Sequence, residues 1–161
     1  MTNINEEVAL LRRIPLFANI EAVKLKLLAF TSRGLTYEAN QILFHQGAEG
    51  DAAYVIIDGT ADILVDTPQG RVSIAKAERN AIVGEIAILC DVPRTATVQA
   101  LTRLETLRID KQQFLKLIQE FPELAIEMLK VLGLRLMHTN LQLTEARKRA
   151  TAEAEVEIPQ H

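Results

Sequence analysis

A chain of 161 residues, 48% of them apolar, is long enough for one domain with a hydrophobic core and is too apolar to be disordered. Its formal net charge of −3 gives no basic surface for nucleic acid, and no apolar run reaches the length needed to span a membrane. Because the lone Cys90 permits no internal disulfide and the N-terminus has no signal-peptide pattern, we expect a cytoplasmic protein.

Short helices are predicted near the N-terminus, over residues 4–34. The apolar residues at positions 23, 25, 27 and 28 fall near a helical period. Asn19 is expected to cap this segment, and Gly34 is expected to end it.

From residue 35 the pattern changes to that of strands. Six β-rich runs are separated by turn clusters, and they cover residues 41–45, 54–57, 61–65, 72–75, 97–100 and 105–109. The segment 66–70 contains Pro68 and is typical of a hairpin loop. Many short strands at regular spacing favour an antiparallel sandwich or barrel over alternating strands and helices.

A helical period returns at Asp110, which is expected to cap a helix through about residue 120, and Pro122 is suited to start the next helix. The last helix carries two apolar stripes, so it needs two packing partners, such as its own barrel and a second subunit. The stripes are Ala125, Met128, Leu129, Leu132, Leu136 and Leu124, Val131, Leu134, Leu141. We expect the domain to cover residues 1–145 and residues 146–161 to form a frayed tail.

Two charged residues, Glu85 and Arg94, stand within the otherwise apolar segment 83–98. Buried charges need a partner, so they either form a salt bridge with each other or contact a ligand. The amides that open a short helical turn at residues 85–89 can hold an anion, and Gly84 lets a ligand approach the backbone. The Arg94 guanidinium matches two phosphate oxygens, while the Glu85 carboxylate accepts from a hydroxyl such as a ribose 2′-OH.

The segment Gly84-Glu85-Ile86-Ala87 followed by Pro93-Arg94-Thr95-Ala96-Thr97-Val98 resembles the phosphate-binding cassette of cyclic nucleotide-binding domains. Upstream, the heptapeptide LRRIPLF at residues 11–17 is similar to the family's N-terminal helix signature. The family's first glycine-rich turn and the strand after it are matched by Gly47, Gly50, Asp51, Tyr54 and Gly59. The similarity covers roughly residues 8–143.

This resemblance implies an eight-stranded antiparallel β-roll, or jelly roll, with N-terminal helices and two C-terminal helices, the last of which acts as a lid or hinge. It further implies that Glu85 binds the ribose 2′-OH, that Arg94 binds the cyclic phosphate, and that the amides of Ile86, Ala87 and Ala96 complete the cradle. The Thr95 hydroxyl is a candidate contact to phosphate and to a guanine base. On the last helix, Arg135, Thr139 and Asn140 are candidate contacts to the base.

The sequence departs from the family pattern before the Gly-Glu pair. A glycine and an aromatic residue are usual there, whereas this chain has Asn80 and Val83. Because asparagine tolerates the left-handed backbone conformation, we expect the turn at Asn80 to be kept.

The resulting hypothesis is a sensor that binds cyclic AMP, with cyclic GMP as a second ligand, and signals through its last helix to a protein effector or a second copy. No cofactor, DNA contact or catalytic residue is expected. His45, His138 and His161 lack metal-ligand spacing, which disfavours a metalloenzyme. Two alternatives remain: a non-binding structural or dimerisation module, and a regulatory fragment of a larger channel, kinase or transcription regulator.

Overall fold

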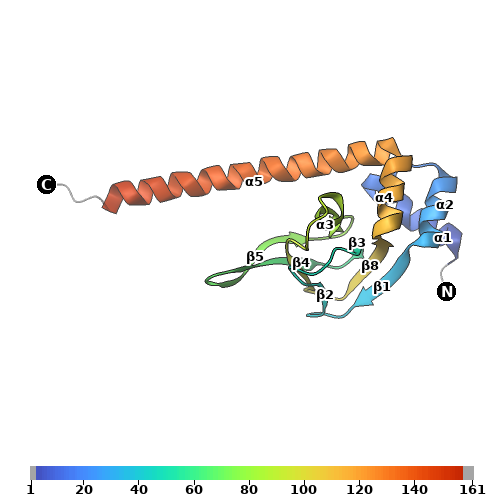
Figure 1. Cartoon of the computed structure of the whole chain (residues 1–161), viewed down its shortest axis with the longest axis horizontal. Coiled ribbons are helices and arrows are strands. Elements are labelled where there is room, and N and C mark those ends of the chain that lie inside the picture. The colour runs from blue at the N-terminus through green and yellow to red at the C-terminus, as the bar shows by residue number, and fades with distance from the viewer. Residues whose placement is uncertain (1–2, 158–161) are drawn as a thin grey trace. The chain divides into compact units, whose positions relative to one another are not determined.

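The computed structural model describes residues 3–157 of the chain. The chain divides into two compact units, Met1–Leu124 and Ala125–His161. The first unit contains all the strands of the described residues (Figure 1). Its helices α1, α2 and α4 gather at one end of the sheets, and the hairpin of β4 and β5 lies at the other end.

The N-terminal helices are α1 (Ile4–Arg12), the 3-10 turn η1 (Pro15–Phe17) and α2 (Ala22–Thr31). The Asn3 side chain caps α1 by accepting a 2.9 Å hydrogen bond from the Glu6 amide. The predicted cap at Asn19 is wrong, because α2 begins after Glu21, which makes no side-chain cap bond. The predicted end at Gly34 is wrong as well, since α2 ends at Thr31 and Gly34 lies in a strand.

Within the described residues, eight strands form two four-stranded antiparallel sheets. They are β1 (Arg33–Tyr37), β2 (Ile42–Phe44), β3 (Ala52–Asp58), β4 (Ala61–Thr67), β5 (Gly70–Ala77), β6 (Ile82–Val83), β7 (Thr97–Ala100) and β8 (Leu104–Asp110). One sheet has the order β1-β8-β3-β6 and the other β2-β7-β4-β5. The predicted eight-stranded antiparallel β-roll is confirmed, although β1 and β6 were not among the six runs read from the sequence.

Two turns have residues with a positive φ, which explains the residue types found there. The β4–β5 hairpin closes where Thr67 pairs with Gly70, as predicted for this loop, and the φ of 119° at Gly70 is one that side chains rarely permit. Before β6, Asn80 has a φ of 73°, so the predicted left-handed conformation at this position is confirmed.

The core of the roll is built largely from small and β-branched side chains. Its buried members are Ala52, Tyr54, Ile56, Ala61, Ala77, Val83, Val98, Ala100 and Leu104. Alanines at several of these positions leave room for the larger rings of Tyr37, Tyr54 and Phe44. The Phe44 and Tyr54 rings stack with centroids 5.8 Å apart, and this pair fixes one wall of the candidate site described below.

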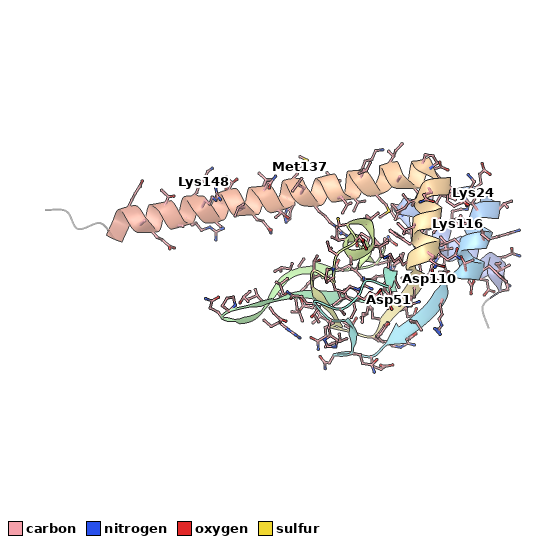
Figure 2. The ribbon with its side chains drawn as sticks, in the orientation of Figure 1. Lys24, Asp51, Asp110, Lys116, Met137 and Lys148 are labelled. Carbon is pink, nitrogen blue, oxygen red and sulfur yellow. The ribbon has the colours of Figure 1, made fainter. Side chains whose placement is uncertain are left out.

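Strand β8 leads directly into α4 (Lys111–Glu120) at a point close to the glycine-rich turn. The Asp110 side chain accepts a 3.0 Å hydrogen bond from the Gln113 amide, so the predicted cap is confirmed. The Lys111 amide donates to the Asp51 carbonyl oxygen at 2.8 Å. Figure 2 shows Asp51 and Asp110 near this junction of β8 and α4.

Helix α5 (Pro122–Glu157) starts at the predicted proline and forms nearly all of the second unit. Helix α5 continues past residue 145 to Glu157. The predicted domain boundary at residue 145 and the predicted fraying of residues 146–161 remain predictions, and residues 158–161 lie outside the described residues. Five large apolar side chains of this unit are each more than 60% exposed: Leu129, Leu134, Leu136, Met137 and Leu141. In the part of the chain that the structure describes, no helix has the length and apolar character needed to cross a membrane.

Candidate functional site

The predicted cassette begins where β6 gives way to the short helix α3 (Glu85–Leu89). Gly84 is the N-cap residue and has a φ of 84°, which favours glycine. A Cβ at Gly84 would lie 2.5 Å from Arg94 Nη1 and 3.2 Å from the Ala52 carbonyl oxygen. Glycine is therefore required here both by the backbone conformation and by the close approach of the arginine.

A second glycine brings the glycine-rich turn against α3. A Cβ at Gly50 would lie 2.6 Å from the Ala87 Cβ, so this contact needs small residues on both sides. The same turn is hydrogen-bonded to the segment after α3, because the Gly47 amide donates to the Arg94 carbonyl and the Arg94 amide donates to the Ala48 carbonyl, both at 2.8 Å. Backbone hydrogen bonds thus join the glycine-rich turn to the cassette.

Arg94 is the central residue of the site, since its side chain is only 1% exposed. Its Nη1 donates to the Gly84 carbonyl at 2.9 Å, and its Nη2 donates to the Ala52 carbonyl at 2.7 Å. The guanidinium also lies over the Phe44 ring, 4.0 Å from the ring centroid. The side chain is therefore held in place by the backbone on its edge and by an aromatic ring on its face.

The carboxylate that pairs with Arg94 comes from Asp51, whose Oδ1 accepts from Nη2 at 3.2 Å. Burial lowers the pKa of Arg94, and the charge of Asp51 opposes that change. Because the Asp51 side chain is 65% exposed, solvent weakens this pairing. Arg94 is consequently a buried cation whose counter-charge is only partly effective, and a bound anion would favour its charged form.

One polar atom of Arg94 is left without a hydrogen bond. Among the described residues, its Nε is the only buried side-chain nitrogen or oxygen that lacks a partner. A guanidinium has five N–H groups, and Arg94 uses three of its own in the bonds to Gly84, Asp51 and Ala52. A buried donor without an acceptor costs about 1–3 kcal/mol, so an acceptor at this atom would stabilise the folded protein.

The remaining cassette residues lie where the sequence predicts. Glu85 is 2% exposed in the first turn of α3, together with Ile86 and Ala87, whose amides precede the first bonds within the helix. Thr95 is exposed, and Ala96 is buried just before β7. The structure therefore brings Gly84, Glu85 and Arg94 to one cassette, while their ligand contacts remain predictions.

The three candidate lid residues, Arg135, Thr139 and Asn140, lie on α5 in the second unit. Their contact with a bound base remains a prediction. The described residues contain no group of three or more His, Cys, Asp or Glu side chains able to hold a metal ion.

Sequence reasoning missed two contributors to the site, Asp51 as the partner of Arg94 and Phe44 as its stacking surface. Asp51 was noted only as part of the glycine-rich turn, and Phe44 only as part of a strand. A signal for Asp51 existed in the two glycines that precede it, Gly47 and Gly50, since glycine lets the backbone approach another group closely. No pattern in the sequence pointed to Phe44.

A hollow of about 330 Å³ lies between the glycine-rich turn and part of the cassette. It is lined by residues of the glycine-rich turn, of α3, of the segment after α3 and of α4: Gly47, Glu49, Gly50, Ala87, Asp91, Val92, Pro93 and Lys111. Gly84, Glu85 and Arg94 do not line this hollow, whereas Ala87, whose amide is a candidate contact to the phosphate, does.

Comparisons with known proteins agree with this geometry. Residues 34–121, more than half of the chain, match the family model described as cyclic nucleotide-binding domain. The cAMP-dependent protein kinase regulatory subunit of Schizosaccharomyces pombe is 30% identical over 110 residues, which make up 68% of this chain and 26% of that protein. Lysophospholipase NTE1 of Chaetomium globosum is 28% identical over 109 residues, 66% of this chain and 7% of that protein.

This chain thus spans only a small part of these curated relatives, and the match does not extend to their whole activities. Among solved structures, a cyclic nucleotide-binding-like protein from Brucella abortus has a TM-score of 0.59 at 30% identity, covering 71% of this chain and 98% of that one. The sensor domain of the transcriptional regulator DNR from Pseudomonas aeruginosa has a TM-score of 0.73 at 26% identity, covering 86% and 93%. The family match, the β-roll and the buried Arg94 beside Gly84 lead to one conclusion: the chain belongs to the cyclic nucleotide-binding domain family.

Proposed function

We propose that this chain is a sensor that binds cyclic AMP in its cassette and acts by binding rather than by chemistry. The observation that carries the proposal is Arg94, a buried cation with an unpaired Nε–H beside a glycine that admits no side chain. A cyclic nucleotide has a singly charged phosphodiester with two free oxygens. The planar guanidinium fits that charge and that geometry, as one cation facing one anion.

On binding, the ligand would lose hydrogen bonds to water and gain hydrogen bonds to protein groups that are already oriented. Arg94 is held by Phe44 and by two backbone carbonyls, so little side-chain freedom remains to be lost on binding. The first-turn amides of α3 at Ile86 and Ala87, with the amide of Ala96, would donate to the same phosphate. Glu85, buried in that turn, would accept from the ribose 2′-OH.

Cyclic AMP is proposed as the first ligand because a relative at 30% identity is by name the regulatory subunit of a cAMP-dependent kinase. Cyclic GMP is the second candidate. The support for it is Thr95, an exposed hydroxyl next to Arg94 that is available to a phosphate oxygen and to a guanine amino group. The proposed output is a contact with a protein, in the cytoplasm.

A second candidate, a module that keeps the fold without binding a ligand, is favoured by one observation. Arg94 already makes three hydrogen bonds and a ring contact, so it also has a structural role that needs no nucleotide. The two functions differ in whether a nucleotide stabilises the folded state.

Thermal unfolding with and without cyclic AMP separates them. At a concentration of 100 times its Kd, a ligand that binds only the folded state stabilises it by about 2.7 kcal/mol, which raises Tm by several degrees. Adenosine 5′-monophosphate at the same concentration serves as the control, because its phosphate is not cyclic and carries additional charge. An unchanged Tm with saturating cyclic AMP and cyclic GMP would favour the structural module.

The output is proposed to pass through α5, whose exposed side chains Leu134, Met137 and Leu141 leave apolar area available for a partner. Arg135, Thr139 and Asn140 are proposed to contact the base, which would order this part of the helix. Amide hydrogen exchange across residues 130–145 should then slow when cyclic AMP is added. The Arg94→Ala variant, measured in the same way, is the control, and unchanged exchange in the wild-type protein at saturation would mean that the signal leaves by another surface.

A further inference from the structure

The carboxylate of Asp51 is shared between two arginines. Its Oδ1 accepts from Arg94 at 3.2 Å, and its Oδ2 accepts from Arg108 Nη2 at 3.3 Å. Arg108 lies on β8, outside both the cassette and the glycine-rich turn, and its side chain is 26% exposed. The Asp51 carboxylate that pairs with Arg94 is therefore shared between the cassette and a strand that the sequence did not connect with the site.

Arg108 is itself held by the aromatic wall of the roll. Tyr54 stands opposite Arg108 in the β3–β8 register, and Phe44 stacks on Tyr54. Burial works to lower the pKa of Arg108, but the interactions with Tyr54 and Asp51 outweigh it and raise the pKa. Arg108 is thus fully charged and oriented toward Asp51.

These contacts link five side chains in a closed cycle that includes Arg94. Arg94 lies over Phe44, Phe44 stacks on Tyr54, Tyr54 interacts with Arg108, Arg108 pairs with Asp51, and Asp51 pairs with Arg94. A substitution at Arg108 can therefore affect Arg94 either through the Asp51 carboxylate or through the Tyr54 and Phe44 rings.

We infer that Arg108 is a positioning residue for the nucleotide phosphate, which acts through Asp51. A phosphate placed at Arg94 lies close to the Asp51 carboxylate, and two anions near one cation compete for it. The positive charge of Arg108 beside Asp51 Oδ2 partly neutralises the Asp51 carboxylate. This reduces both the repulsion between Asp51 and the phosphate and the attraction between Asp51 and Arg94. This role rests on the proposed function, since it assumes an anion at Arg94.

The register supplies a further positive charge at the same place. Arg33 of β1 is the cross-strand partner of Arg108, so the two side chains share one face of the sheet. Like charges in opposite positions normally destabilise a sheet. The ion pair of Arg108 with Asp51 offsets this like-charge neighbour.

A double-mutant cycle tests the inference, with the Kd for cyclic AMP as the readout. Arg108→Gln in the otherwise wild-type chain should weaken binding by about two- to fivefold, because an ion pair to an exposed carboxylate has a small effect. In an Asp51→Asn background the same change should alter Kd by less than about twofold, since the intermediary charge is gone. Arg108→Lys, which keeps the charge, should restore part of the affinity. Arg103→Gln, which breaks an exposed pair with Glu105, is the matched control and should leave Kd unchanged.

The outcomes separate this role from the proposed function. Binding of cyclic AMP by the wild-type chain supports the proposed function whatever Arg108 does, and its absence overturns both. If Arg108→Gln leaves Kd unchanged, Arg108 does not position the phosphate. If it weakens binding equally in the Asp51→Asn background, Arg108 acts on the fold and not through Asp51, which also overturns the inference.

Discussion

Arg94→Ala is expected to weaken cyclic nucleotide binding by roughly tenfold to several hundredfold, because hydrogen bonds to charged groups contribute about 1.5–3 kcal/mol each. The variant should also be less stable than the wild-type protein. Arg94 is the donor to the carbonyl oxygens of Gly84 and Ala52, and its removal leaves the buried Ala52 acceptor without this donor at a cost of about 1–3 kcal/mol. The measurement is calorimetric titration with cyclic AMP at a temperature where the variant is still folded.

Two further variants keep this result interpretable. Arg94→Lys retains a cation but loses the planar pair of donors, so it should bind with an affinity between those of the wild type and the alanine variant. Arg71→Ala removes an exposed arginine from a surface pair with Asp66 and should bind like the wild type. A folded Arg94→Ala variant that binds with wild-type affinity would show that the phosphate does not meet this residue.

Gly84→Ala is the second change expected to have a large effect, although it adds only one methyl group. The new Cβ would lie 2.5 Å from Arg94 Nη1, and the φ of 84° is strained for alanine. The clash and the strain together should reduce the free energy of unfolding by about 1–3 kcal/mol. Because the methyl group pushes the guanidinium from its place, affinity for cyclic AMP should fall by about tenfold or more, as one charged hydrogen bond is disturbed.

Gly34→Ala is the matched control. A Cβ at Gly34 meets nothing within 4 Å, and Gly34 has no positive φ. Urea unfolding and titration of both variants should therefore show a loss for Gly84→Ala alone. Equal behaviour of the two variants would mean that Arg94 can move without consequence, and that the close approach at Gly84 does not shape the site.

Much of the cassette was predictable because its chemistry is local in sequence. Gly84, Glu85 and Arg94 are close in the chain, and each has a residue type whose presence in an apolar segment needs a reason. The hairpin at Gly70 and the cap at Asp110 were predictable for the same reason, since a turn or a cap depends on the few residues that form it.

The errors have physical causes as well. Strand β6 has only two residues, Ile82 and Val83, too few to show any alternation. Strand β1 begins with Arg33 and Gly34, which do not resemble a strand, and it is held by its register with β8. The predicted cap at Asn19 had the preferred residue type, yet α2 starts later and uses Glu21 without a cap bond. Tertiary pairing decided these elements, and a single sequence contains no pattern that reports it.

The charge arrangement at Arg94 also lay beyond sequence reasoning. Arg94 pairs with Asp51, which is 43 residues away in the chain, and Asp51 in turn pairs with Arg108. From the sequence, the candidate partners of Arg94 were Glu85 and a ligand, and no pattern proposed a second carboxylate. Contacts between residues so far apart are fixed by the closure of the roll, which brings the glycine-rich turn, α3 and β8 together.

The most direct test of the central claim is isothermal titration calorimetry of the wild-type chain with cyclic AMP, cyclic GMP and 2′-deoxy cyclic AMP in parallel. The account predicts saturable binding of cyclic AMP at one site per chain and weaker binding of the 2′-deoxy analogue, because Glu85 loses its hydroxyl partner. No heat of binding with any of the three ligands, together with an unchanged Tm, would contradict the assignment of the cassette as a nucleotide site.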